Sequence, residues 1–106
     1  MKYFMDTHDK TKGSFPAQEL TEEQFISQFA ALEEAAKECG VFGHAAHVNL
    51  KDGKAFCFMS GPDEESIRKA HAMINLPYDT ITEVKRVTGA DMRVSQPVEA
   101  QKRKAG

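Results

Sequence analysis

Residues 46–58 read AHVNLKDGKAFCF, and this stretch decides how the rest of the chain can fold. Two runs rich in aromatic and β-branched residues flank the tripeptide KDG at 51–53. Strand-forming runs on either side of an Asp-Gly turn are typical of a β-hairpin, with Gly53 in the left-handed conformation. The sequence therefore predicts two antiparallel strands, over residues 41–50 and 54–60.

The length of the hairpin loop determines which side chains share a face of the sheet. A three-residue loop places Val48 opposite Phe56 and His47 opposite Cys57. A two-residue turn would mix polar and apolar side chains on both faces, because a slip of one residue flips every side chain. We therefore expect the three-residue loop, with His47 and Cys57 as direct cross-strand neighbours.

A strand and a helix are predicted before this hairpin. Residues 2–8 alternate and are rich in aromatic residues, which indicates a strand. Thr21 and Gln24 have the spacing of a helix capping box, and Gly40 is suited to end the helix. Between them an apolar stripe recurs at helical spacing, formed by Phe25, Phe29, Leu32, Ala36 and Cys39.

A second helix and a last strand follow the hairpin. Residues 61–77 begin with Pro62 and acidic residues, and Pro77 closes the helical pattern. The expected inward face of this helix is Ile67, Ala70, His71 and Ile74. We interpret His71 as a hydrogen-bonded core histidine. Residues 79–87 alternate less cleanly and are predicted to form the last strand.

The resulting order is β-α-β-β-α-β. Two β-α-β units with right-handed crossovers give a four-stranded antiparallel sheet of strand order 4-1-3-2. Both helices then lie on one face, which is the ferredoxin-like α+β sandwich. We expect a single domain over residues 1–88 and a flexible C-terminal tail over residues 89–106, because the tail lacks a periodic apolar pattern.

A sheet with helices on one side leaves a second, open face. We expect Tyr3, Met5 and Thr7 to point to the core, which leaves Phe4, Asp6 and His8 on the open face. The first and third strands are neighbours, so His8 approaches Cys57. The predicted site on the open face is His8, His47, Cys57, Asp6 and Glu83. Imidazole, thiolate and carboxylate donors suit nickel, zinc or copper better than calcium or magnesium.

Other functions remain open for the same residues. His8 and His47 can be solvated strand residues, and Cys57 can be a small apolar filler. Cys57 beside His47 can also be an activated thiol pair, although no orienting third residue is evident. The open face could serve as the active site of a small dimeric oxygenase or isomerase. A third interpretation, ranked after the metal site and the enzyme, is a dimerisation or interaction module whose open face is only an interface.

Composition excludes several classes of protein. The chain has 106 residues, 41% of them hydrophobic, and a net charge of −2, which is not the charge of a nucleic-acid binder. No apolar run approaches the roughly 18 residues of a membrane helix, and the N-terminus lacks the pattern of a secretory signal. We therefore expect a cytoplasmic protein in which Cys39 and Cys57 are free thiols.

Four motifs resemble a known family. They are MDTHD at 5–9, AHVNLKDGKAFCF at 46–58, PDEESIRKAH at 62–71 and ITEV at 81–84. In this order they resemble a family of small bacterial proteins of unknown function that includes an actinobacterial nickel-responsive, nickel-binding protein. The resemblance implies a ferredoxin-like fold, a homodimer, and metal sequestration or response without established catalysis, with nickel the first expected metal.

The resemblance also bears on individual residues. It places Asp6 and His8 in the first motif, and His47 and Cys57 in the second. These positions coincide with four of the five residues predicted for the open face. His71 matches a recurrent Ala-His pair of the family, which adds a functional interpretation to its expected place in the core.

Overall fold

The computed structural model of the chain describes residues 1–95. Its strands are β1 (Lys2–Asp9), β2 (Phe42–Asn49), β3 (Lys54–Gly61) and β4 (Thr80–Val84). Its helices are the 3-10 turn η1 (Lys10–Lys12), α1 (Glu22–Glu38), α2 (Glu64–Met73) and α3 (Gly89–Ser95). The order β-α-β-β-α-β predicted from the sequence is confirmed for the part that ends with β4.

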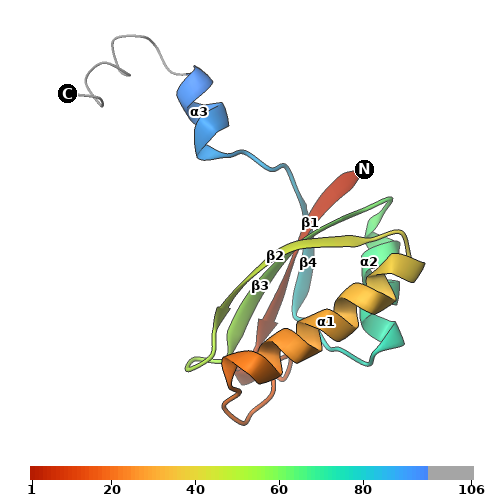
Figure 1. The fold of residues 1–106 in the computed structure, drawn as a ribbon, viewed down its shortest axis with the longest axis vertical. Helices are drawn as coiled ribbons and strands as arrows, with labels where there is room; N and C mark the ends of the chain where they lie inside the picture. Colours follow the sequence, from red (N-terminus) through yellow and green to blue (C-terminus); the bar gives the residue numbers. More distant parts are fainter. Residues whose placement is uncertain (96–106) are drawn as a thin grey trace, which may run out of the picture.

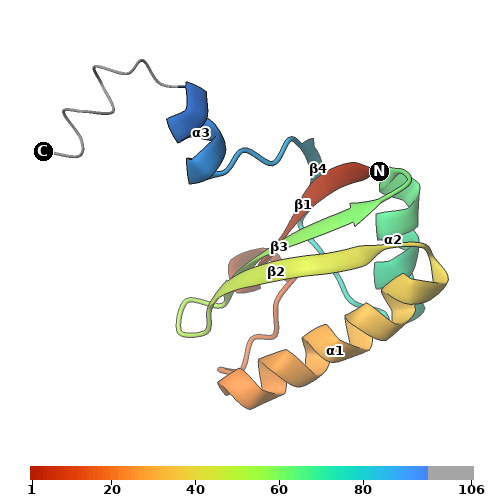
Figure 2. The same cartoon turned by 45° about the horizontal axis from the view of Figure 1, so that its top comes forward.

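The four strands form one antiparallel sheet in the order β2-β3-β1-β4. This is the predicted order 4-1-3-2 viewed from the other edge. Helices α1 and α2 lie on the same side of the sheet (Figure 1), and the other side carries no helix in either view (Figure 2). The ferredoxin-like α+β sandwich is therefore confirmed. We call the two sides the covered face and the open face.

The chain beyond β4 leaves the body of the protein. An extended segment leads to α3, which stands away from the sheet in both views (Figures 1 and 2). The tail predicted for residues 89–106 thus begins with a helix, and residues 96–106 lie outside the described residues. Within residues 1–95, no helix combines the length and hydrophobicity needed to span a membrane.

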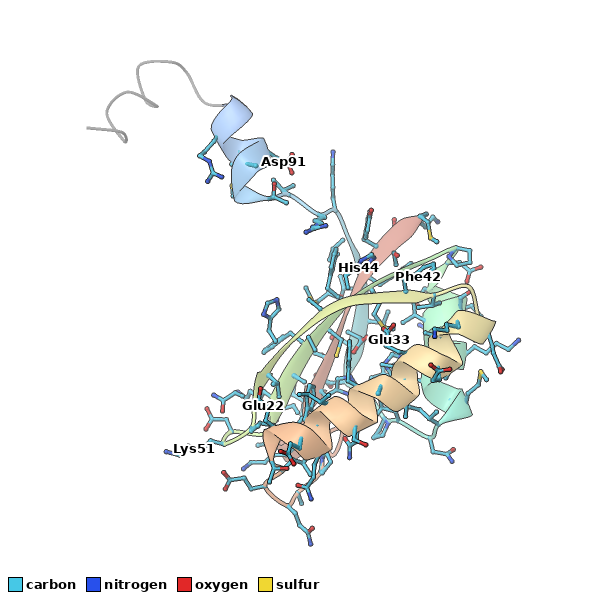
Figure 3. The ribbon with its side chains drawn as sticks, viewed as in Figure 1. Glu22, Glu33, Phe42, His44, Lys51 and Asp91 are labelled. Atoms are coloured by element: carbon cyan, nitrogen blue, oxygen red, sulfur yellow. The ribbon has the colours of Figure 1, made fainter. Side chains whose placement is uncertain are left out.

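Both main helices begin with side-chain caps. The Thr21 hydroxyl accepts a hydrogen bond from the backbone N–H of Gln24, and the Gln24 side chain accepts one from the backbone N–H of Thr21. The predicted capping box is therefore confirmed. Asp63 caps α2 by accepting from the backbone N–H of Ser66. On the sheet side of α1, Glu33 approaches Gly43 of β2 (Figure 3).

The core lies between the covered face and the two helices. Its members are buried apolar residues from every layer: Phe4, Leu32, Ala36, Val41, Met59, Ile67 and Ala70. Phe4 of the central strand β1 is 1% exposed and is among the largest fully buried side chains. The apolar stripes predicted for α1 and α2 supply the helical half of this core.

The predicted faces of β1 are wrong. Phe4, Asp6 and His8 are buried on the covered face, whereas Tyr3 and Met5 lie on the open face. The prediction had placed Tyr3, Met5 and Thr7 in the core instead. Burial of polar groups is tolerated when they satisfy one another, and the side chains of Asp6 and His8 are hydrogen-bonded.

The predicted hairpin register is also wrong. Gly53 is left-handed as expected, with φ of 66°. However, Asn49 pairs with Lys54, so the loop has four residues, 50–53. Asn49 closes this loop by accepting a hydrogen bond from the backbone N–H of Asp52. The extra residue shifts the register by one and places His47 opposite Phe56, not Cys57.

The observed faces can be tested with two phenylalanines. Replacing buried Phe4 with alanine should lower the free energy of unfolding by about 3–5 kcal/mol, because the change opens a cavity in the core. Phe56 is 46% exposed on the open face. Its replacement by alanine should change the stability of the monomer by less than about 1 kcal/mol. Urea unfolding of both variants gives the comparison, and the reverse ranking would contradict the observed faces.

Candidate metal centre

Three side chains with metal-ligating atoms converge on the covered face. One ligand atom each from Asp6, His8 and Cys57 lies within 4.8 Å of the others. Asp6 and Cys57 are cross-strand partners on β1 and β3, and His8 follows Asp6 on the same face of β1. All three are at least 95% buried, with exposed fractions of 1%, 5% and 3%. The cluster therefore lies in the interior, beneath the helices.

His8 is fixed at both ring nitrogens. Its Nε2 lies 2.7 Å from Oδ1 of Asp6, and its Nδ1 lies 2.7 Å from the carbonyl oxygen of Pro77 and 3.2 Å from that of Ser14. Carbonyl and carboxylate oxygens only accept hydrogen bonds, so both nitrogens donate. The protonated form of His8 satisfies all these contacts and forms a buried ion pair with Asp6.

The Pro77 carbonyl reaches His8 because of the way α2 ends. Asn75 adopts a left-handed conformation, with φ of 54°, and the backbone N–H of Leu76 donates to the carbonyl of His71 at 2.9 Å. Asparagine is one of the few residues that enter this conformation readily, and it is a common helix terminator for this reason. The chain then turns back toward β1 and brings Pro77 to His8.

A second histidine faces the same carboxylate. His71 of α2 is 0% exposed, and its Nδ1 donates to the Ile67 carbonyl at 2.8 Å. Its Nε2 lies 3.5 Å from Oδ2 of Asp6. Neither of these two buried atoms has a hydrogen-bond partner among the described residues. An unpartnered buried polar group costs roughly 1–3 kcal/mol, so the pair calls for an explanation.

The pKa values of the cluster reflect burial and mutual interaction. Burial raises the pKa of Asp6, but the interactions with His71 and His8 outweigh it, and the net pKa lies below 3.8. Burial lowers the pKa of His8, but Asp6 and the two backbone carbonyls outweigh it, and the net pKa lies above 6.5. Burial, together with the Asp6 carboxylate, raises the pKa of the Cys57 thiol. Cys57 is therefore a protonated thiol when no metal is bound.

A small cavity of about 30 Å³ adjoins the cluster. His8 and Cys57 form part of its wall, and most of the remainder is apolar, contributed by Phe15, Phe25, Phe29, Leu32 and Leu76. Phe15 and Phe25 stack with ring centroids 6.3 Å apart. These aromatic rings separate the cluster from solvent on the side of α1.

The structure brings together three of the five residues predicted for the site. Asp6, His8 and Cys57 meet as expected, but on the covered face and not on the open face. His47 pairs with Phe56 and lies on the open face, away from Cys57. The suggested thiol pair of His47 and Cys57 is therefore wrong.

Glu83 does not join the group either. It pairs with Phe4 at the exposed edge strand β4. His71 is the histidine of the core that the sequence predicted, hydrogen-bonded as expected. Its approach to Asp6 was not predicted from spacing, because the two residues lie on separate elements and are 65 positions apart. The one signal in the sequence for a role of His71 in the site was its match to the Ala-His pair that recurs in the family.

Comparison with known proteins assigns the family. Residues 4–84 match the family described as "Nickel responsive protein SCO4226-like". The chain belongs to this family. The match includes all members of the cluster and ends with β4, so α3 lies outside the SCO4226-like region.

One solved structure gives a measure of the likeness. The crystal structure of SCO4226 from Streptomyces coelicolor A3(2) superposes with a TM-score of 0.69 at 24% sequence identity. The alignment covers 81% of this chain and 99% of that chain. At this identity the likeness supports the fold alone. A search of curated proteins finds no matching relative.

The Asp6–His8 ion pair predicts how stability depends on pH in the presence of a chelator. The pKa of His8 is raised, so its contribution is complete below pH 6.5 and is lost as the pH rises through the raised value. The pKa of Asp6 is lowered, so its contribution is complete above pH 3.8 and is lost only as the pH falls through the lowered value. Urea unfolding should therefore show the free energy of unfolding decreasing above pH 6.5.

The control for this dependence is His8→Gln, which removes the titrating ring and leaves the other three histidines. Its free energy of unfolding should decrease less with pH over the same interval. Equal decreases in the variant and in the natural protein would show that the ion pair does not have the assigned protonation.

Proposed function

We propose that this protein binds a divalent transition metal through Asp6, His8 and Cys57. The observation that supports the proposal is the convergence of a carboxylate, an imidazole and a thiol within 4.8 Å in the interior, where Oδ2 of Asp6 has no hydrogen-bond partner within residues 1–95. A mixed set of oxygen, nitrogen and sulfur donors suits nickel, zinc or copper. Nickel is the first candidate because the family is described as nickel-responsive.

The charges of the cluster fit a divalent cation. Asp6 and the thiolate form of Cys57 together carry two negative charges, which would neutralise a divalent ion in a site without solvent. Metal-ligating histidines usually donate their other ring N–H to a carbonyl or carboxylate, which fixes the ring. His8 already has this arrangement, since its Nδ1 donates to the Pro77 carbonyl.

The proposed use of this site is metal sequestration or response in the cytoplasm. Two observations support it. The cluster is buried, which favours retention of an ion over exchange with a substrate. Both cysteines are free thiols, as expected in a reducing compartment.

The alternative is an enzyme with its active site on the open face. Most of the residues predicted for such an active site do not lie on that face. Asp6, His8 and Cys57 lie on the covered face, and His47 is the one member of the predicted site that points to the open side. The raised pKa of Cys57 also argues against a thiolate nucleophile in the metal-free protein.

Metal binding can be measured by calorimetry on the full chain without a histidine tag. Nickel should bind with a stoichiometry near one, and Cys57→Ser should weaken binding by at least about tenfold, which is the effect typical even of residues outside the ligand shell. Binding should be tighter at pH 8 than at pH 6, because the metal must displace protons from His8 and Cys57, whose pKa values are raised.

The matched control is His47→Asn, which removes an exposed histidine on the opposite face. It should bind nickel as the natural protein does. If pure metal-free protein binds neither nickel, zinc nor copper at micromolar concentrations, the proposed function fails. If His47→Asn abolishes binding and Cys57→Ser does not, the metal site lies on the open face instead.

We also propose that a second copy of the chain covers the open face. The support is a group of apolar side chains on this face. Met5, Ala45, Phe58 and Val84 line a shallow depression, whose wall also includes His47, Lys85 and Arg86. Phe56 stands beside them and is 46% exposed. Exposed clusters of large apolar side chains typically mark interfaces.

Light scattering tests the proposed homodimer. Phe56→Asp should reduce the molar mass of the particle from that of a dimer to that of a monomer, because it buries a charge in the interface. Ile26→Asp is the matched control, since Ile26 is also a large exposed apolar residue, 56% exposed, but lies on α1. The proposal is contradicted if the natural protein is a monomer. It is also contradicted if Phe56→Asp keeps the mass of the dimer, as Ile26→Asp should.

A further inference from the structure

A further inference follows from two buried polar atoms at the cluster that have no hydrogen-bond partner among the described residues. His71 Nε2 and Asp6 Oδ2 face one another at 3.5 Å, both are buried, and neither has a hydrogen-bond partner among the residues described. The Nδ1 of His71 donates to the Ile67 carbonyl, so in the neutral ring Nε2 carries the lone pair. With a neutral ring, two groups that accept but cannot donate would face each other, and either a proton on Nε2 or a cation between the two atoms supplies the missing positive charge.

His71 and His8 are arranged alike about the carboxylate. Each ring has its Nδ1 anchored by a backbone carbonyl, and each directs Nε2 to a different oxygen of Asp6. The rings lie roughly parallel, with centroids 5.7 Å apart and an angle of 25° between their planes. A cation beside the carboxylate would therefore meet two imidazoles held in the tautomer that binds metals.

The separation of the orphaned atoms also fits a shared ion. Metal bonds of about 2.0–2.2 Å at the tetrahedral angle separate two donors by about 3.3–3.6 Å. The observed 3.5 Å between Nε2 of His71 and Oδ2 of Asp6 falls in this interval. It is longer than the 2.7 Å between Nε2 of His8 and Oδ1, which is the length of a hydrogen bond.

We propose that His71 becomes the fourth ligand when an ion binds, giving a closed set of four donors from Asp6, His8, Cys57 and His71. In this structure the ligand atoms of Asp6, His8 and Cys57 lie within 4.8 Å of one another, and His71 approaches this group through Oδ2 of Asp6, at 3.5 Å. This inference rests on the proposed function and deepens it. Three protein ligands leave a position for water or substrate, as catalytic sites do, whereas four ligands give a site that retains its ion. With two anionic and two neutral donors, the complex of a divalent ion carries no net charge.

The test uses cobalt(II) as a spectroscopic substitute, added to the full chain in its natural form and as His71→Gln. The natural protein should show thiolate-to-cobalt charge transfer and the intense visible bands of tetrahedral cobalt. In His71→Gln the charge transfer should remain, since Cys57 is unchanged. The visible bands should weaken because water enters the fourth position, and the affinity should fall by at least about tenfold.

The matched control is His44→Gln, which alters a histidine that is exposed and bonded to Ser60. It should leave the spectrum and the affinity unchanged. If His71→Gln behaves like His44→Gln, His71 is not a ligand, while the proposed three-residue site still stands. If the natural protein binds neither cobalt nor nickel, the proposed function fails and this inference fails with it.

A second measurement covers the case in which His71→Gln does not fold. Nuclear magnetic resonance of the natural protein with ¹⁵N-labelled histidines reports each ring nitrogen directly. Loading with zinc should shift the Nε2 signals of His71 and His8 and leave those of His44 and His47 in place. A His71 signal that does not change on loading would overturn the proposal.

Discussion

The burial of the Asp6 carboxylate is the constraint on which the rest of the structure depends. A charged group in the interior is costly unless a partner compensates it, and here the compensation comes from separate parts of the chain. His8 is held by the Pro77 carbonyl, which is delivered by the left-handed turn at Asn75. His71 comes from the last turn of α2. The placement of α2 and of the loop after it is therefore tied to one carboxylate on β1.

The direction of Asp6 also sets the two faces of the sheet. Side chains alternate along a strand, so Phe4 and His8 must follow Asp6 to the covered face. Pairing carries this choice across to β3, where Cys57 lies opposite Asp6. The four-residue loop closed by Asn49 then sends His47 to the open face. The polar cluster is thus enclosed beside the apolar core, and several apolar side chains are left on the open face.

The sequence predicted what depends on local patterns. The capping box at Thr21, the apolar stripes of the helices and the order of the strands follow from spacing and connection rules, and so does the approach of His8 to Cys57. The faces of β1 could not be predicted in this way, because each side of it carries an aromatic residue and polar residues. What decides between them is the hydrogen bonding of His8 to Asp6 and to the Pro77 carbonyl, which exists only after the chain has folded.

The interior position of the cluster determines what a bound ion can do. An ion at Asp6 would be separated from solvent by α2 on one side and by the stacked rings of Phe15 and Phe25 on the other. Because the proposed ligands on β1, β3 and α2 come together only in the native state, the free energy of binding an ion there would add directly to the stability of the fold. A site of this kind couples metal concentration to the stability of the protein, which suits sequestration or response better than turnover.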